Sequence, residues 1–243
     1  MMNSRLEAAG LKKCYQKKTV VADVSITVKK NEVVGLLGPN GAGKTTTFSI
    51  ILGLIRQDAG QIFLGDEDIS GLPMYIRARR GLCLLPQESS AFRKLSVEDN
   101  LLSILENMPE RPARKDGNPQ EVLNELGLTK LKAVKAYTLS GGEKRRLEIA
   151  RALVTNPEFV LLDEPFTGID PLAICDLQEI ILGLKDKGIG VLITDHSVRD
   201  TLKITDRAYI IDKGRILAQG TPEQLVSSSE VKKIYLGEEF DLD

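Results

Sequence analysis

The sequence predicts an α/β fold in which helices cover both faces of a mostly parallel sheet. Three features lead to this prediction. Short apolar runs typical of buried strands alternate with helical patterns in both halves of the chain, a glycine-rich loop joins one such strand directly to a helix, and the central segment is mostly helical. Strands that alternate with amphipathic helices form parallel sheets covered on both faces.

The N-terminal third predicts several strands and one helix. Residues 5–37 contain short strands rich in β-branched residues, and the last of these, at 32–37, is an apolar run that stops at Gly38. Such a run is typical of a buried strand that ends in a turn. Helical spacing follows over 44–54. Two further strands are predicted at 61–64 and 81–85.

The rest of the chain predicts a helical block and then a return to alternating strands and helices. The helices of the block are predicted at 97–105, 120–126 and 142–153, with a Pro/Gly-rich stretch at 108–119. After Pro157, strands are predicted at 159–162, 190–194 and 208–212, and a helix at 172–187. We therefore expect one domain over residues 1–243, in which 5–87 and 156–243 form the core and 88–155 form a helical subdomain.

Composition argues against several classes of protein. The 243 residues include 33 Lys and Arg against 34 Asp and Glu, and a formal net charge of −1 gives no general attraction to nucleic acid or anionic lipid. The three cysteines lie far apart, which fits a reducing cytosol and argues against a disulfide framework or a zinc site. Residues 1–11 lack the apolar segment of a signal peptide, and the longest apolar stretch, near 48–55, is far shorter than a membrane span. We expect no nucleic-acid partner, no lipid insertion and no transmembrane segment.

A phosphate-binding loop follows the strand at 32–37. The segment Gly38-Pro-Asn-Gly-Ala-Gly-Lys-Thr45 matches GxxxxGK(S/T) in full and lies between a predicted strand and a predicted helix, as that motif requires. Glycines let backbone N–H groups turn toward a phosphate, Lys44 would bridge the β- and γ-phosphates, and the Thr45 hydroxyl would ligate Mg²⁺. The expected ATP-binding residues are Gly38, Pro39, Asn40, Gly41, Ala42, Gly43, Lys44, Thr45 and Thr46.

Two carboxylates follow the predicted strand at 159–162. A parallel sheet delivers Asp163 to its carboxyl edge, where nucleotides bind in open α/β sheets, and Asp163 could hold Mg²⁺ there through water. The adjacent Glu164 is the candidate to accept the proton of the water that attacks the γ-phosphate. Charges at a strand end can also mark a simple exposed turn, but the phosphate loop in the same chain favours the catalytic interpretation.

A second anion-binding segment lies in the helical block. Leu139-Ser-Gly-Gly-Glu143, followed by Lys144-Arg145-Arg146, resembles the LSGGQ signature of ATP-binding cassette (ABC) ATPases. The resemblance implies ATPase activity and a P-loop NTPase fold with an N-terminal antiparallel β subdomain. Because one nucleotide already has its phosphate loop, Ser140, Gly141 and Gly142 would contact the ATP of another subunit in a head-to-tail homodimer. A serine N-cap followed by flexible glycines is the alternative interpretation.

Further positions are carried over from this resemblance one at a time. It places Tyr15 against the adenine, Gln87 near Mg²⁺ or the attacking water, and His196, the only histidine, at the γ-phosphate. Asp170 ends Gly168-Ile169-Asp170, which resembles the D-loop that faces the opposite subunit. The expected catalytic residues are Glu164, His196, Gln87 and Lys44. The expected Mg²⁺ ligands are Thr45, Gln87 and, through water, Asp163.

Two residues depart from the family pattern. Glu143 stands where Gln is more common, and Ser197 follows His196 where Asp is common. Glu143 puts a negative charge beside the second anion-binding segment, so its effect on that segment stays open.

Segments between these motifs narrow the resemblance. Phe92-Arg-Lys-Leu-Ser-Val97, Leu192-Ile-Thr-Asp-His196 and the tail Val231-Lys-Lys-Ile-Tyr-Leu-Gly-Glu-Glu-Phe240 are similar to ATPase subunits of lipopolysaccharide-export ABC transporters of Gram-negative bacteria. This resemblance implies a peripheral subunit on the cytoplasmic face of the inner membrane. It would drive two transmembrane permease subunits through their coupling helices, with Phe92, Arg93 and Leu95 in the groove that receives each helix.

Two other functions stay open at this level. ATP-binding subunits of branched-chain amino-acid importers carry related cassettes with a similar short tail. A soluble ABC ATPase that acts in DNA repair or translation is disfavoured, because residues 44–140 leave no room for a long coiled coil and the chain carries each motif once.

Overall fold

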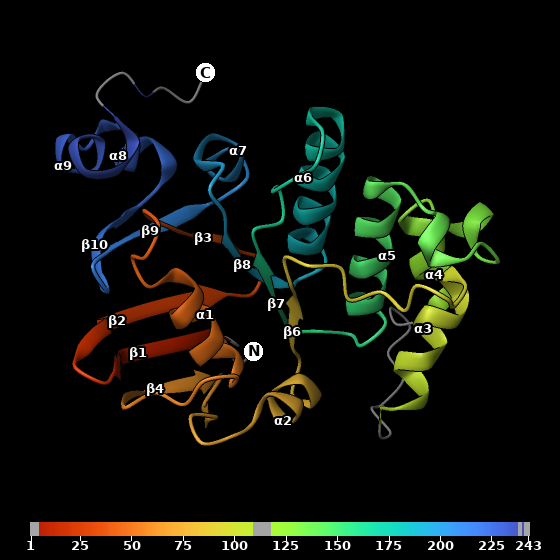
Figure 1. The fold of residues 1–243 in the computed structure, drawn as a ribbon, viewed down its shortest axis with the longest axis horizontal. Coiled ribbons are helices and arrows are strands. Elements are labelled where there is room, and N and C mark those ends of the chain that lie inside the picture. Colours follow the sequence, from red (N-terminus) through yellow and green to blue (C-terminus); the bar gives the residue numbers. More distant parts are fainter. Residues whose placement is uncertain (1–4, 109–117, 238–239, 241–243) are drawn as a thin grey trace.

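One sheet of ten strands runs through the part of the chain that the computed structural model describes, residues 5–108, 118–237 and 240 (Figure 1). The strand order is β5-β4-β1-β2-β10-β9-β3-β8-β7-β6. The Pro/Gly-rich stretch predicted at 108–119 lies mostly outside the described residues, as do residues 1–4 and part of the tail. The sheet has an antiparallel half and a parallel half.

The antiparallel half is built from the N-terminal part of the chain. It contains β1 (Arg5–Tyr15), β2 (Lys18–Lys29), β4 (Ala59–Leu64) and β5 (Glu67–Asp68). β1 pairs antiparallel with β2 and β4, which confirms the expected antiparallel part of the fold. The prediction of short strands over 5–37 is wrong in length, because β1 and β2 form a hairpin of 11 and 12 residues. Register shifts near Leu11 and Lys13 interrupt the alternation of side chains that marks a long strand.

The parallel half contains the strands that lead to the candidate site. These strands are β9 (Arg207–Asp212), β3 (Val33–Leu37), β8 (Gly190–Thr194), β7 (Phe159–Asp163) and β6 (Leu82–Leu85). Each is parallel to its neighbour, so their carboxyl ends lie at one edge of the sheet. The sequence predicts all five to within a residue or two. β10 (Arg215–Gly220) runs antiparallel to β9 and meets β2 at one parallel pair, Arg215 and Asp23.

Hydrophobic clusters lie on both faces of the parallel half. Along β7, Phe159 and Leu161 belong to one cluster, and Val160 and Leu162 belong to the other. α1 (Lys44–Leu52) packs in the first cluster, and α6 (Pro171–Asp186) packs in the second. The predicted parallel sheet with two covered faces is therefore confirmed.

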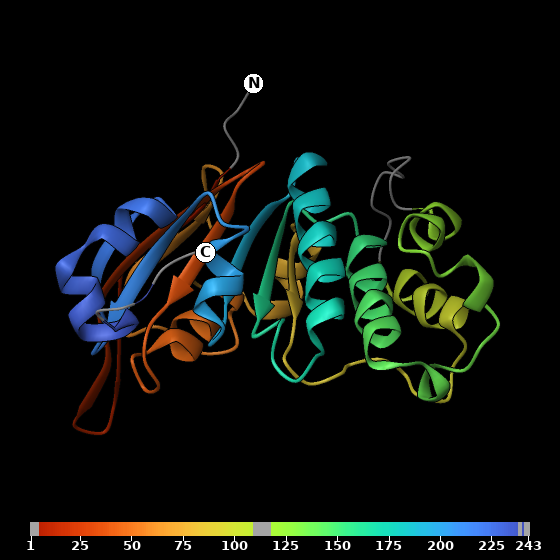
Figure 2. The same cartoon turned by 90° about the horizontal axis from the view of Figure 1, so that it is seen from above.

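Three helices gather beside α6 at one end of the molecule (Figures 1 and 2). They are α3 (Val97–Glu106), α4 (Pro119–Glu125) and α5 (Gly141–Leu153), each within one residue of its predicted ends. Their buried residues Leu101, Leu123 and Leu147 share one cluster with β7 and α6. The helical block thus packs on the same face of the sheet as α6.

The strands β5 and β10 have no counterpart in the sequence prediction, and neither do several short helical elements. The helical elements are α2 (Met74–Arg79), α7 (Val198–Leu202), α8 (Pro222–Ser227), α9 (Ser229–Val231) and a helical turn at Lys232–Leu236. Each spans six residues or fewer, which is less than two helical turns, so a helical period cannot be recognised in the sequence.

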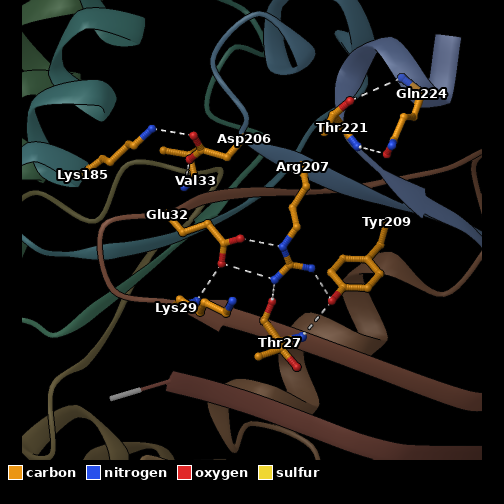
Figure 3. A network of polar contacts seen from close by, with 10 residues as sticks. All are labelled: Thr27, Lys29, Glu32, Val33, Lys185, Asp206, Arg207, Tyr209, Thr221 and Gln224. Atoms are coloured by element: carbon orange, nitrogen blue, oxygen red, sulfur yellow. Dashed lines mark hydrogen bonds and ion pairs between the residues drawn. The ribbon is translucent and has the colours of Figure 1, made fainter. Parts of the chain in front are cut away.

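A polar network ties the amino ends of β9 and β3 to β2, at the edge of the sheet away from the candidate site (Figure 3). Arg207 Nε lies 2.5 Å from Glu32 Oε1, and the same guanidinium donates to the Thr27 carbonyl and, at 2.5 Å, to Tyr209 Oη. Tyr209 Oη also accepts a bond from the Thr27 N–H at 3.1 Å. These bonds join the parallel and antiparallel halves.

Candidate functional site

The predicted phosphate loop connects β3 to α1, and two of its three glycines are required by their surroundings. Gly43 has φ of 110°, and a Cβ there would lie 2.7 Å from the Val20 carbonyl oxygen. Gly38 has φ of 157°, and a Cβ there would lie 2.1 Å from the Ile211 carbonyl oxygen. Neither position can carry a side chain without displacing backbone.

Lys44, the first residue of α1, is buried and folds back over the loop. Its Nζ donates to the carbonyl oxygens of Gly38 at 2.6 Å and Pro39 at 3.2 Å. Burial lowers the pKa of Lys44, while the negative charges of Glu164, Asp163 and Asp195 act in the opposite direction. These carbonyl contacts hold the ammonium group over the loop.

A cavity of about 300 Å³ lies over the loop and joins it to two of the predicted catalytic residues. Its lining residues are Val20, Asn40, Gly41, Gly43, Lys44, Thr45, Thr46, Glu164 and His196. Thr45 is exposed there, at the start of α1. The loop, the helix N-terminus and Lys44 give the cavity three groups that attract phosphate. The lining residues therefore fit the phosphates of a nucleoside triphosphate.

Gln87 and His196, which are predicted to be catalytic, both contact Glu164, although the three residues follow different strands. Gln87 Nε2 donates to Glu164 Oε2 at 2.8 Å, and His196 Nε2 lies 2.5 Å from Glu164 Oε1. Gln87 follows β6, Glu164 follows β7, and His196 follows β8. The parallel register of these three strands brings their carboxyl ends together, so the structure brings the three residues into contact.

Asp163 lies one residue before Glu164, at the last position of β7. Its Oδ1 accepts a bond from Thr194 Oγ1 at 2.7 Å, across from it on β8. Asp163 is half-buried and is not part of the lining of the cavity.

The sequence prediction assigns no role to Asp195, which the structure places next to Glu164 and His196, behind the lining of the cavity. Its side chain is 1% exposed, and burial raises the pKa of its carboxyl group. Its two oxygens accept bonds from the backbone N–H groups of Phe166 and Ser197, at 2.8 and 2.7 Å. The signal that indicated Asp163, a carboxylate at the end of a buried strand, applies equally to Asp195.

The second anion-binding segment caps α5. Ser140 Oγ accepts a bond from the Glu143 N–H at 3.3 Å, and Glu143 Oε2 accepts from the Ser140 N–H at 2.8 Å. The bonds that the Ser140 N–H and the Ser140 hydroxyl donate to Glu143 Oε2 hold the pKa of Glu143 below its usual range. The N-cap interpretation of this segment is therefore correct as far as one chain is concerned. Ser140, Gly141 and Gly142 do not line the cavity over Lys44.

Asp170 and Tyr15 also lie outside the lining of that cavity. Asp170 is the N-cap of α6, and its Oδ1 accepts a bond from the Ala173 N–H at 3.0 Å. Tyr15 ends β1 with 45% of its surface exposed, and Lys13 Nζ lies 5.5 Å from the centre of its ring. Both side chains are accessible to a partner or a larger ligand.

The three residues predicted to contact a membrane subunit lie between β6 and α3. Phe92 is 48% exposed, and the Arg151 guanidinium stands 4.9 Å from its ring centre. The buried Asn100 exchanges two hydrogen bonds with the Phe92 backbone. Arg93 is exposed and Leu95 is half-buried. The backbone of this segment is fixed while its aromatic and basic side chains remain accessible.

The fold and the cavity together define a class of protein. A parallel sheet whose central strand opens into a GxxxxGK(S/T) loop, with carboxylates following a neighbouring strand, is the arrangement of a P-loop NTPase. Residues 21–167 match the ABC transporter family. The chain belongs to this family and is one of its ATPases.

Individual relatives agree with this assignment. The lipopolysaccharide export system ATP-binding protein LptB of Haemophilus influenzae is 52% identical over 98% of this chain and 100% of its own length. The protein of the same name from Escherichia coli K12 is 51% identical over 98% of this chain and 99% of its own. A crystal structure of MJ1267, an ATP-binding cassette of an ABC transporter, in its ADP conformation is 30% identical with a TM-score of 0.83, over 97% of this chain and 99% of its own. The predicted fold class and ATPase activity are confirmed.

Within the ranges 5–108, 118–237 and 240, no helix combines the length and apolar character that crossing a membrane requires.

Proposed function

We propose that this chain is the ATP-hydrolysing subunit of a transporter that exports lipopolysaccharide from the inner membrane. The observation that carries the proposal is 51–52% identity over nearly the whole chain with proteins named for lipopolysaccharide export. This observation favours export over the import of branched-chain amino acids. The chain would supply motion from ATP hydrolysis on the cytoplasmic face, and its membrane partners would supply specificity for the cargo.

Binding of ATP is assigned to the phosphate loop and the start of α1. The loop N–H groups and Lys44 would hold the β- and γ-phosphates, and Tyr15 would stack on the adenine. No three His, Cys, Asp or Glu side chains of the described residues gather closely enough to hold a metal ion by themselves. Mg²⁺ bound with a nucleotide takes few protein ligands and relies on phosphate oxygens and water. Thr45, Gln87 and, through water, Asp163 fit that need.

Hydrolysis is assigned to the cluster around Glu164. Its carboxylate would orient a water for in-line attack on the γ-phosphorus and accept the proton of that water. Gln87 and His196, which contact Glu164, would exchange these contacts for the attacking water and the γ-phosphate. This exchange would make the cluster sensitive to whether the γ-phosphate is present.

A homodimer that encloses two ATP molecules is part of the proposal. Ser140, Gly141 and Gly142 would contact the ATP held by the other copy, and Asp170 would face that copy. A Cβ at Gly141 would meet nothing within 4 Å, so packing inside one chain does not require glycine there. A glycine that its own chain does not need suits close approach by another molecule.

Replacement of Glu164 tests the catalytic assignment. Glu164→Gln keeps the shape of the side chain but removes the proton acceptor, so steady-state ATP hydrolysis should fall by about 100-fold or more. ATP binding should persist, and an ATP-bound dimer should accumulate in size-exclusion chromatography with Mg-ATP. Glu121→Gln, a surface change on α4, is the matched control. Normal turnover in Glu164→Gln would contradict the assignment.

The dimer has a separate test. Ser140→Arg places a bulky cation in the segment that would approach the other copy's ATP. In the Glu164→Gln background, this change should abolish the ATP-dependent dimer while each chain still binds nucleotide, as measured by equilibrium dialysis. A dimer that persists in Ser140→Arg would count against the composite site.

Co-purification from native membranes tests the transport assignment. The chain should be recovered with two lipopolysaccharide-export permease subunits, and Phe92→Ala should weaken that recovery without lowering the unfolding temperature by more than a few degrees. Recovery with amino-acid permeases instead would overturn the cargo assignment and leave the ATPase assignment intact.

A further inference from the structure

The end of β8 holds two catalytic loops through one buried carboxylate. Asp195 directly follows β8, and its two oxygens accept backbone N–H bonds from two different loops. One donor, Phe166, lies two residues after Glu164. The other, Ser197, directly follows His196. Each loop therefore carries one of the residues assigned to the γ-phosphate.

We propose that Asp195 is a positioning residue for ATP hydrolysis, which holds the loop of Glu164 in register with the loop of His196. The inference deepens the proposed function and rests on the roles assigned there to Glu164 and His196. Asp195 itself does not line the cavity and would not touch the nucleotide.

The backbone at Glu164 explains why this loop needs support. Glu164 has φ of 46°, a left-handed conformation that residues other than glycine adopt uncommonly. Its N–H donates to the Thr194 carbonyl at 2.7 Å, so the end of β8 holds one side of the residue. Asp195 holds the other side through Phe166. Thr194, the last residue of β8, and Asp195, which follows it, thus fix the direction of the Glu164 side chain.

The same carboxylate also fixes the loop of His196. The bond from the Ser197 N–H to Asp195 Oδ1 closes a tight turn around His196, and Ser197 then leads into α7. With this turn closed, His196 Nε2 lies 2.5 Å from Glu164 Oε1. One side chain therefore determines the geometry between the two catalytic residues.

A carboxylate suits this position better than an amide. Both oxygens of Asp195 face N–H donors, whereas an asparagine offers one oxygen and would turn its NH₂ group toward the second donor. Asp195→Asn keeps the volume of the side chain but loses the hydrogen bond to one of the two loops. The change therefore separates positioning from packing.

The test uses the chain of 243 residues and measures kcat and KM separately. Asp195→Asn should lower kcat by about 10- to 100-fold, because a shift of about 1 Å between reacting groups has effects of this size. The KM for ATP should stay within about twofold, because the phosphate loop is untouched. Asp206→Asn is the matched control: Asp206 also accepts a backbone N–H bond, from Val33 at 2.9 Å, but at the opposite edge of the sheet. That variant should change kcat little, whatever it does to the unfolding temperature.

A double variant distinguishes positioning from a general structural role. Asp195→Asn added to His196→Ala should slow hydrolysis by less than it slows the otherwise unchanged enzyme, because one of the two residues whose relative position Asp195 sets is gone. Equal effects in both backgrounds would overturn the inference, as would a folded Asp195→Asn chain with normal kcat. If Asp195→Asn does not fold, Asp195→Ser, which keeps one acceptor in a smaller side chain, is measured in the same way.

Failure of this inference differs from failure of the proposed function. If Glu164→Gln and His196→Ala are both slow while Asp195→Asn is normal, the positioning role alone is wrong. If Glu164→Gln and His196→Ala turn over ATP normally, the catalytic assignments are wrong, and the positioning role falls with them.

Discussion

At residue 143, one glutamate serves two demands that conflict. Its carboxylate completes the cap of α5 by accepting bonds from the Ser140 N–H and Oγ, both at 2.8 Å. The same negative charge lies in the segment proposed to approach the triphosphate of the other copy. A carboxylate strengthens the cap near the helix N-terminus but repels phosphate.

Glu143→Gln separates these demands. Glutamine still accepts a bond from the Ser140 N–H, so the unfolding temperature should change by no more than a few degrees. Removal of the charge should strengthen ATP-dependent dimer formation and lower the KM for ATP by roughly two- to tenfold. Titration calorimetry and steady-state kinetics at several salt concentrations measure both effects. An unchanged KM at low salt would show that residue 143 does not approach the phosphates.

The positions of the residues proposed as catalytic were predictable from the sequence where a motif placed them. Lys44, Glu164, Gln87 and His196 all follow strands that the sequence predicts, and the structure brings the last three together. Asp195 carries no motif of its own, and its two bonds go to backbone groups of loops whose paths the sequence does not reveal.

At the scale of elements, α1 is held at both of its ends. The phosphate loop lies at its N-terminus, and the guanidinium of Arg77 from α2 lies at its C-terminus, where it donates to the carbonyls of Ile50 and Ile51 at 2.9 and 2.6 Å. Arg77 is 2% exposed and also donates to the carbonyls of Leu72 and Ser70. Burial lowers the pKa of Arg77 to about 10. A cation at this end also favours the helix dipole.

Arg77→Lys should destabilise the protein by about 3 kcal/mol or more, because one ammonium group cannot reach all four carbonyls and would stay buried with fewer partners. Urea unfolding followed by circular dichroism measures the change. Arg79→Lys is the control on the same helix, since Arg79 is exposed and stacks on Tyr75. It should change the free energy of unfolding by about 0.5 kcal/mol or less. Similar losses in both variants would refute the role of Arg77 as an anchor of α1.

Buried parallel strands and helices of seven residues or more were predictable from the sequence, whereas the long β1–β2 hairpin and the shorter helices were not. The parallel strands and the helices α1, α3, α4, α5 and α6 match the sequence prediction closely. The sequence does not predict α2, because its single buried residue, Arg77, is charged and gives no apolar signal.

At the scale of the whole molecule, the C-terminal tail returns to the back of the phosphate loop. Val231 is fully buried, and Tyr235, Leu236 and Phe240 pack against a cluster that contains Leu37, the last residue of β3. The Arg199 guanidinium on α7 lies 5.5 Å from the centre of the Phe240 ring. The tail therefore packs against both the strand before Gly38 and the helix after His196. The described part of the tail is therefore packed on the core of the molecule.

Tyr235 gives this packing a dependence on pH. Burial raises the pKa of Tyr235 to about 12, and the nearby Asp195 charge acts in the same direction, against a hydrogen bond from the Gly38 backbone. The folded-state pKa lies above the ordinary value near 10, so the stabilising contribution is complete below about pH 10 and is lost as the pH rises toward about 12.

The loss should be visible by comparison with Tyr235→Phe, which keeps the ring and removes the titrating hydroxyl. Between pH 9 and pH 11, the unchanged protein should lose roughly 1 kcal/mol more of its free energy of unfolding than the variant does. Arg77, which also titrates in the alkaline range, is present in both proteins, so its contribution cancels. Urea unfolding at the two pH values gives the difference, and Tyr209→Phe, which alters a hydroxyl at the far edge of the sheet, is the control. Equal losses in the unchanged protein and Tyr235→Phe would mean that the phenol is not buried against the phosphate loop in solution, and that the tail does not dock there.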